Sequence, residues 1–431
     1  MRPTIGEEVC THVADAIISA RVSFRDVLRN REYRTLWIAD AQSMAGDQLA
    51  RVALSVLVFE RTASSVLTAL TYALTFLPAL VGGALLSGIA DRLPRRRVMI
   101  ACDLLRAGLL GLMSIPALPV WAVSVLLVLA VLAGSPFSAA ESALLPDLLD
   151  GERYVVATGL RTITNQMAQL AGFAGGGIAV AIIGAHAGLA VDAATFAVSA
   201  LLIRVGVRAR PAPGGEAETG AGEQSYLASI GAGIRLVARQ PRLRTLLAFS
   251  WLLGLYVVPE GIAPAYAKSV GGGPVGLGLL MAAGPAGTAL GTYLFVRFVP
   301  ATRRSRWIGP VAIAGGIPLA LCAFEPGLGI SIALWALSGA GAAYQVQVAP
   351  DYVRAVPDGR RAQAIGVAAS GLLASQGIGI LLGGFVAASQ GAASAVAWAG
   401  GVAAVLAALL TVAWSRMSRG GATSGSAAAE N

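Results

Sequence analysis

The sequence predicts an all-α integral membrane protein of twelve transmembrane helices, arranged as two pseudo-symmetric halves of six. Three observations predict this fold: the composition is strongly apolar, the apolar residues form membrane-length runs, and the two halves repeat one another. The 431 residues are 56% hydrophobic and only 13% charged, whereas soluble proteins carry about 25% charged residues. The net charge of +9 does not indicate nucleic-acid binding, because the basic residues lie in short loops between apolar runs.

Twelve apolar runs are long enough to cross a bilayer. A hydrocarbon core about 30 Å thick requires about 20 apolar residues in a helix, because backbone polar groups in lipid must be satisfied within the segment. The first six predicted spans are 36–58, 65–88, 98–116, 119–140, 156–183 and 187–206. The second six are 245–267, 275–297, 308–323, 328–349, 364–387 and 392–414.

The positions of the basic residues support the number and the orientation of these spans. Cytoplasmic loops carry an excess of Lys and Arg. With the N-terminus inside, only Arg61 and Lys268 of the 32 basic residues fall in predicted outer loops, and Arg51 lies within the first span. One span more or fewer would destroy this asymmetry. We therefore expect a multi-pass protein of a bacterial plasma membrane, with both termini in the cytoplasm.

The spans divide the chain into five predicted segments. Two six-helix halves are flanked by cytoplasmic segments, and the linker between them is rich in Pro, Gly and Glu, which is typical of a flexible connection. The segments are an N-terminal extension (1–33), the N-terminal half (34–206), the central linker (207–243), the C-terminal half (244–415) and a disordered cytoplasmic tail (416–431).

An internal repeat relates the two halves. Spans five and eleven share four residues at a constant separation of 207 positions, and the glycines of the following turns, Gly184 and Gly391, keep the same separation. A second match joins the loops after spans two and eight, where Arg95 and Arg96 pair with Arg303 and Arg304. The four pairs in spans five and eleven are Gln169 and Gln376, Gly172 and Gly379, Gly176 and Gly383, and Gly177 and Gly384. Paired halves of this kind are typical of transporters that alternate access about a central site.

The loop "GIADRLPRRR" and the twelve spans resemble the major facilitator superfamily, whose signature after span two is roughly G-x-L-A-D-R-x-G-R-R. Asp91, Arg92, Arg95 and Arg96 match it, whereas Ser87 and Pro94 replace its glycines. The stretches "GDQLARVALSVLVFERT", "ADRLPRRRVMIACDLLRA", "SALLPDLL" and "QLAGFAGGGI" with "DAATFAVSALL" are similar to a bacterial exporter branch that includes enterobactin-exporter-like and macrolide-efflux-like proteins. This resemblance implies the major facilitator fold.

Two interpretations of this arginine-rich loop remain open. The loop is either a gate or only an anchor that fixes the topology. The resemblance implies that Asp91 contacts the N-terminal end of span eleven in one access state, where a helix end attracts a carboxylate. Asp103 and Arg106, three residues apart at the start of span three, extend the charge network of this cytoplasmic gating loop.

Charged residues within spans are costly and are therefore functional candidates. Asp47, Glu260, Asp40 and Arg51 are the proton-coupling candidates, because a carboxylate in an apolar cavity can accept and release a proton. The alternatives are a static ion pair between Asp47 and Arg51, an outer-gate contact for Glu260, and a contact with the loop network for Asp40. Prolines beside Glu260 predict a loosened span seven.

The glycines of spans five and eleven allow close helix packing. Gly172, Gly176 and Gly177 resemble the family's antiporter motif G-P-x-x-G-G, with Phe173 in place of its proline, so packing alone and a coupling role both remain open. Ligand pockets are mostly apolar with few polar groups. The cavity-lining candidates are Asn165, Gln166, Gln169, Trp251, Tyr256, Tyr344, Gln345 and Gln347.

These features favour a secondary active exporter of a hydrophobic or amphipathic small molecule, exchanged for protons. A facilitator or importer, or a non-transporting sensor on the same scaffold, are the alternatives. The sequence has no Walker, HExxH or GxSxG motif, so we expect neither direct ATP coupling nor an enzyme. We expect a monomer whose partners are its substrate, protons and lipid, with no cofactor, metal or nucleic acid.

Reporter tags inserted after residues 117, 186 and 325 test the predicted topology. We expect all three tags to be reached by a reagent that does not cross the plasma membrane. A tag after residue 215 in the central linker is the control and should be protected. Protection of the first three tags would exclude the twelve-span arrangement.

Overall fold

The computed structural model describes residues 23–86, 93–211, 234–357 and 360–427, and these residues are helical with no strand. The N-terminal half consists of α2 (Phe24–Leu28), α3 (Arg31–Thr62), α4 (Ser65–Ala73), α5 (Leu77–Leu86), α7 (Arg95–Met113), α8 (Val120–Leu148) and α9 (Gly151–Gly206). The C-terminal half begins with α11 (Pro241–Trp251), α12 (Leu253–Tyr256), α13 (Val258–Gly261), α14 (Ala263–Ser269) and α15 (Pro274–Phe298). It continues with α16 (Arg304–Leu321), α17 (Gly327–Gly341), α18 (Gln345–Ala355), α19 (Arg361–Gln390) and α20 (Ala392–Ala427), with short 3₁₀ turns at Cys322–Phe324 and Ala342–Tyr344.

The described helices cover all twelve predicted spans. Nine of them are long and apolar enough to cross a membrane, and one of these, α9, holds two predicted spans. The remaining two spans are α3 and α7, which contain charged side chains. Large apolar side chains such as Trp121, Ile182 and Phe324 are more than 70% exposed on the outside of the bundle, as expected for a surface that faces lipid. The all-α membrane fold is thus confirmed.

The glycine repeat has the same structural role in both halves. Gly184 and Gly391 have φ of +82° and +91° and end the preceding spans at matching turns, because glycine adopts this backbone conformation without steric cost. Gly172 packs on α3, and Gly379 packs on the α12 to α13 segment. Spans five and eleven therefore dock on spans one and seven in the same way.

Gly177 and Gly384 bring the two halves together. A Cβ atom at Gly177 would lie 2.7 Å from Cα of Gly278 in α15, and one at Gly384 would meet Ala69 in α4. Lys268 also lies over the ring of Phe59, with 5.9 Å from Nζ to the ring centroid. We call the end of the bundle that holds residues 59–64, 184–186, 268–274 and 388–391 the far end. The halves pack together there.

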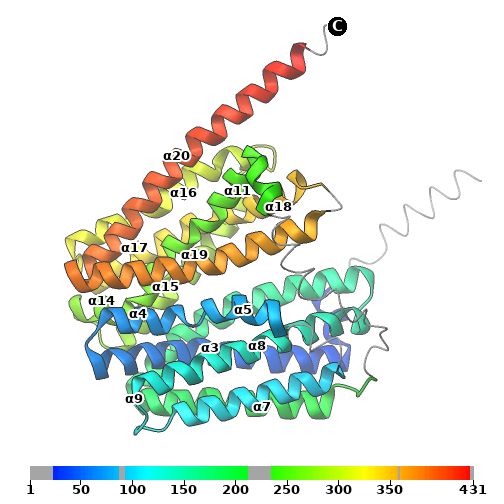
Figure 1. The fold of residues 1–431 in the computed structure, drawn as a ribbon, viewed down its shortest axis with the longest axis vertical. Coiled ribbons are helices and arrows are strands. Elements are labelled where there is room, and N and C mark those ends of the chain that lie inside the picture. The colour runs from blue at the N-terminus through cyan, green and yellow to red at the C-terminus, as the bar shows by residue number, and fades with distance from the viewer. Residues whose placement is uncertain (1–22, 87–92, 212–233, 358–359, 428–431) are drawn as a thin grey trace, which may run out of the picture.

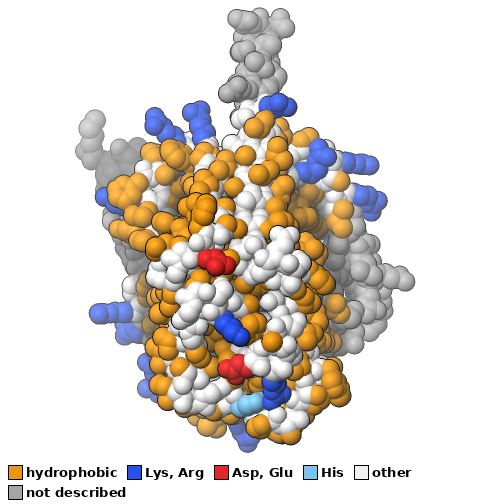
Figure 2. Space-filling view, turned by 90° about the vertical axis from the view of Figure 1, so that its left-hand side faces the viewer, with side chains coloured by type: hydrophobic (Ala, Val, Ile, Leu, Met, Phe, Trp, Pro, Cys, Tyr) orange, Lys and Arg blue, Asp and Glu red, His pale blue; other side chains and the backbone are white. Residues whose placement is uncertain are grey.

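The opposite end, which we call the linker end, holds the start of α3 and the end of α18. In Figure 1, α4 and α19 lie side by side near α14, and the two halves diverge toward the linker end. Figure 2 looks onto the far end, where charged side chains are few and most Lys and Arg side chains stand at the rim. This distribution agrees with the loop asymmetry of the sequence.

Two expectations for the terminal segments have different outcomes. The tail 416–431 was expected to be disordered, but α20 continues to Ala427, because extending an existing helix costs far less than nucleating one. Residues 1–22 of the N-terminal extension and residues 212–233 of the central linker lie outside the described residues. Residues 234–239, before α11, are helical.

Substitution of Gly177 by Leu should separate the halves at the far end, because the new side chain collides with the backbone of α15. Gly175→Leu is the matched control, since a Cβ there meets no atom within 4 Å. The measurement is the distance between spin labels at positions 60 and 268, in a background without native cysteines. We expect a longer distance in Gly177→Leu alone; equal distances in both variants would contradict the packing.

Candidate functional site

A cavity of about 290 Å³ lies between the two halves, near the middle of the bundle. Its apolar surface comes from both halves: the N-terminal half contributes Phe76 and Phe173, and the C-terminal half contributes Met281 and Trp335. The polar groups that line it are Arg51, Gln166, Gln169, Tyr256, Glu260, Thr288, Ser338, Gln345 and Gln376. An apolar wall with a few polar groups is the usual composition of a small-molecule site.

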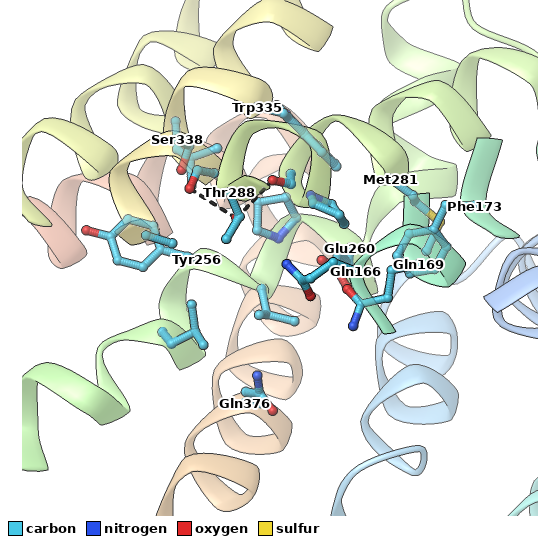
Figure 3. Close-up of a pocket in the computed structure, with 18 of the residues that line it drawn as sticks. Gln166, Gln169, Phe173, Tyr256, Glu260, Met281, Thr288, Trp335, Ser338 and Gln376 are labelled. Carbon is cyan, nitrogen blue, oxygen red and sulfur yellow. Dashed lines mark hydrogen bonds between the residues drawn. The ribbon is translucent and has the colours of Figure 1, made fainter. Parts of the chain in front are cut away.

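Glu260 enters this cavity from a broken span. Span seven forms four short helices in place of one, and Pro259 and Pro264 stand at the starts of the last two, because proline lacks the N–H that a continuous helix needs. In Figure 3, the side chains of Glu260, Gln166 and Gln169 lie close together, with Tyr256 and Ser338 on the other side of the cavity. Gln169 and its repeat partner Gln376 both line the cavity.

A hydrogen bond joins the two halves at Glu260. The hydroxyl of Tyr72 in α4 donates to Oε2 of Glu260 at 2.6 Å. The guanidinium of Arg51 lies 6.0 Å from the Tyr72 ring centroid and 5.1 Å from that of Phe76. A carboxylate of the C-terminal half therefore lies against a hydroxyl, with a cation of the N-terminal half close by.

Asp47 pairs with a different arginine from the one expected. Nη2 of Arg106 in α7 lies 2.9 and 3.1 Å from the two carboxylate oxygens of Asp47, whereas Arg51 extends toward the aromatic rings. Asp103 was expected to join Arg106, but it accepts a hydrogen bond from Ser199 at 2.6 Å. The reason is tertiary: α3, α7 and α9 pack together, so residues of neighbouring helices are nearer than the residue one turn away.

Asp40 belongs to a buried cluster near the linker end of the N-terminal half. Nη2 of Arg161 lies 2.5 Å from Oε2 of Glu141, and its Nε lies 3.5 Å from Oδ2 of Asp40. Asp40 and Glu141 are 7% and 3% exposed. Two carboxylates thus share one guanidinium. The contact of Asp40 with the arginine-rich loop, one alternative from the sequence, does not occur within the described residues.

The predicted lining residues divide into two groups. Gln166, Gln169, Tyr256 and Gln345 line the central cavity. The other four bond elsewhere: Asn165 accepts from Gln169 and Gln347 donates to Asp351 within their own helices, whereas Trp251 donates to the carbonyl of Ala368 and Tyr344 to that of Phe249 on neighbouring helices. These four do not line the central cavity in this structure.

The described part of the arginine-rich loop contacts its own half. Arg95 pairs with Asp147 at 2.5 Å and donates to the carbonyl of Ala143. Arg96 donates to the carbonyl of Arg204. These contacts join the start of α7 to the linker ends of α8 and α9. Asp91 and Arg92 lie outside the described residues, so the contact expected between Asp91 and span eleven stays a prediction.

Sequence reasoning missed three residues that the structure brings to these sites. Tyr72 binds Glu260, Arg161 binds two carboxylates, and Asp192 is completely buried in α9. Asp192 had a signal in the sequence, since it is an isolated carboxylate inside an apolar span. Tyr72 had none, because its partner is 188 residues away along the chain.

This architecture, two repeated six-helix halves around a central cavity, defines a class of membrane transport proteins. The family model described as Major Facilitator Superfamily matches residues 36–326. The chain belongs to this family.

Known proteins support the same assignment. An uncharacterized MFS-type transporter of Bacillus subtilis (strain 168), YkuC, is 25% identical over 182 residues, which are 42% of this chain and 42% of that protein. A crystal structure of a POT family transporter with a thioalcohol-conjugated peptide aligns with a TM-score of 0.72 and 11% identity, over 89% of this chain and 96% of that one. A nucleoside transporter, NupG, aligns with a TM-score of 0.67 and 16% identity, over 90% and 99%. These structural likenesses show the fold.

A third solved structure shows the same fold. A bacterial homologue of the human lysosomal transporter Spinster, described as inward-facing and unoccupied, aligns with a TM-score of 0.65 and 14% identity, over 89% of this chain and 97% of that one.

Proposed function

We propose that the protein exports a hydrophobic or amphipathic small molecule across a bacterial plasma membrane, in exchange for protons, by alternating access. One observation carries this proposal: a largely apolar cavity lies between the two halves, and a partly buried carboxylate, Glu260, lines it. The halves meet at the far end and diverge toward the linker end. A substrate bound between them would be exposed first on one side and then on the other as the halves rock.

The lining of the cavity favours an amphipathic substrate over a strongly polar one. Phe76, Phe173, Met281 and Trp335 supply apolar and aromatic surface, and amides and hydroxyls supply a few hydrogen bonds. The volume of about 290 Å³ is at the lower end for a drug-sized ligand, for which about 300–1,000 Å³ is usual. A drug, an antibiotic, a siderophore or another metabolite fits this description.

The proposed direction rests on the sequence. The stretches that resemble a bacterial exporter branch lie mostly in spans one to six, and they support efflux. The Tyr72–Glu260 bond supports the coupling: a group that changes protonation while bridging the halves links proton binding to their contact. Import and facilitated diffusion on the same fold are distinguished from export by the transport measurement.

Purified protein in proteoliposomes provides that measurement. A pH gradient is imposed, and the movement of a panel of dyes, macrolides and siderophores is followed. We expect at least one compound to move in the direction opposite to the proton flow, and only while the gradient lasts. Movement with the protons would indicate an importer, gradient-independent movement would indicate a facilitator, and no movement of any compound would contradict the proposal.

Glu260→Gln should lower gradient-driven transport of the responding compound at least about tenfold, because glutamine keeps the shape but cannot exchange a proton. Glu325→Gln is the matched control; it lies at an exposed far-end turn, and we expect transport as in the wild type. Thermal unfolding in detergent verifies that both variants fold. Wild-type transport by Glu260→Gln would remove Glu260 from the coupling mechanism.

A further inference from the structure

A second cavity lies entirely within the N-terminal half. Its volume is about 470 Å³, and α3, α5, α7, α8 and α9 surround it. Four charged side chains line it: Asp47 and Arg51 from α3, Arg106 from α7 and Asp192 from α9. The hydroxyls of Ser135 and Ser138 also line it. Charged side chains among membrane-spanning helices are costly, so their presence in this cavity indicates a function.

Asp192 is the least compensated of these groups. Its side chain is completely buried. Oδ1 accepts a hydrogen bond from the hydroxyl of Thr195 at 3.1 Å, whereas Oδ2 has no hydrogen-bond partner among the described residues. The carboxylate packs against Gly46, where a Cβ atom would collide with Oδ1. The glycine beside Asp47 thus makes room for the second carboxylate.

The charged groups near Asp192 contact other residues. Arg106 is the cation nearest to both carboxylates, and its Nη2 binds the two oxygens of Asp47. More than one turn from the helix ends, the remaining charged groups of the surrounding helices are Arg51, which lies over Phe76, Asp103, which accepts from Ser199, and Asp40 and Glu141, which share Arg161. α5 contributes no charged residue. Of the two guanidiniums that line the cavity, Arg106 pairs with Asp47 and Arg51 lies over aromatic rings, so Asp192 has no ion-pair partner among the described residues.

We infer that Asp192 is a second proton-binding carboxylate of the transporter, and that one proton balances the charge of the Asp47–Arg106–Asp192 site. This inference rests on the proposed proton coupling and adds the residue at which the proton binds. The proton bonds to Oδ2 of Asp192 and leaves Asp47 paired with Arg106. When the O–H bond breaks, the proton passes to water in the cavity, and the ionised Asp192 attracts Arg106 away from Asp47.

When Arg106 moves from Asp47 toward Asp192, the contacts between helices change. Arg106 extends from α7 toward α3, and its guanidinium lies 3.8 Å from the centroid of the Phe196 ring on α9. Phe196 and Asp192 are one turn apart on the same helix, so a small rotation of the arginine side chain moves it from one carboxylate toward the other. The contacts between α3 and α9 then change with the proton.

Infrared spectroscopy of the full-length protein in lipid nanodiscs tests this site without a known substrate. A protonated carboxylic acid has a C=O stretch band that an ionised carboxylate lacks. We expect such a band at neutral pH, and we expect Asp192→Asn to remove the component that Asp192 contributes, seen as a negative band in the variant-minus-wild-type difference spectrum. Thr195→Val, which deletes the hydroxyl bound to Oδ1, should shift the band without removing it.

Asp351→Asn is the matched control. Asp351 is also buried, but its two oxygens accept hydrogen bonds from Gln347 and Ser305 at 2.8 and 2.6 Å, so it needs no proton and its removal should leave the band unchanged. Replacing sodium and potassium by choline at constant pH distinguishes a proton from a metal cation. A band whose intensity is the same in the wild type and in Asp192→Asn, or an Asp192 component that appears only in choline, would overturn the inference.

Transport then separates this inference from the proposed function. If wild-type protein moves a compound against the proton flow, Asp192→Asn should lose at least about nine-tenths of the gradient-driven rate and keep downhill movement of the same compound. Wild-type gradient dependence in Asp192→Asn would overturn the inference alone. Absence of gradient-driven transport in the wild type would overturn the proposed function, while the infrared band would still report on the proton site.

Discussion

The structure depends on one constraint: charge placed inside lipid-surrounded helices must be compensated within the protein. Five carboxylates and three arginines lie more than one turn from the ends of the long helices α3, α7, α8 and α9 of the N-terminal half. They are Asp40, Asp47, Asp103, Glu141 and Asp192, with Arg51, Arg106 and Arg161. Because the carboxylates outnumber the arginines, ion pairs with arginine cannot neutralise every carboxylate. Hydroxyl groups and protons must balance the difference.

The two halves repeat the same helix packing but carry different charged groups. Gly184 and Gly391 adopt the same unusual backbone at equivalent turns, and Gly177 and Gly384 each pack against the opposite half. The repeat therefore preserves the surfaces on which the halves move. The charged groups do not repeat. Ion pairs gather in the N-terminal half, whereas Glu260 stands on the broken span of the C-terminal half and meets Tyr72 across the interface.

Much of the fold follows from the sequence, because the bilayer permits few alternatives. Span length, loop charge and the repeat at 207 positions place all twelve helices, and Gln169 and Gln376 line the same cavity as the repeat suggests. The choice of partners does not follow. Arg51 is one turn from Asp47 on the same helix, yet Arg106 binds it, because the tilt and rotation of α7 against α3 decide the shorter distance. The sequence pattern of one helix does not predict how a neighbouring helix is rotated against it.

The same limit explains the missed residues. Asp192 was visible as a charge within a span, but only the packing against Gly46 shows that it lies beside Asp47. Tyr72 and Arg161 acquire their roles from residues on other helices. Long-range contacts of this kind are properties of the assembled bundle.

A double-mutant cycle on Arg106 tests the charge balance most directly. Thermal unfolding in detergent is measured for Arg106→Gln alone and in combination with Asp47→Asn or Asp192→Asn. If Arg106 balances the charge of Asp47 while a proton balances that of Asp192, Arg106→Gln lowers the melting temperature, Asp47→Asn restores part of the loss, and Asp192→Asn restores less. Losses that simply add in both combinations would contradict the account.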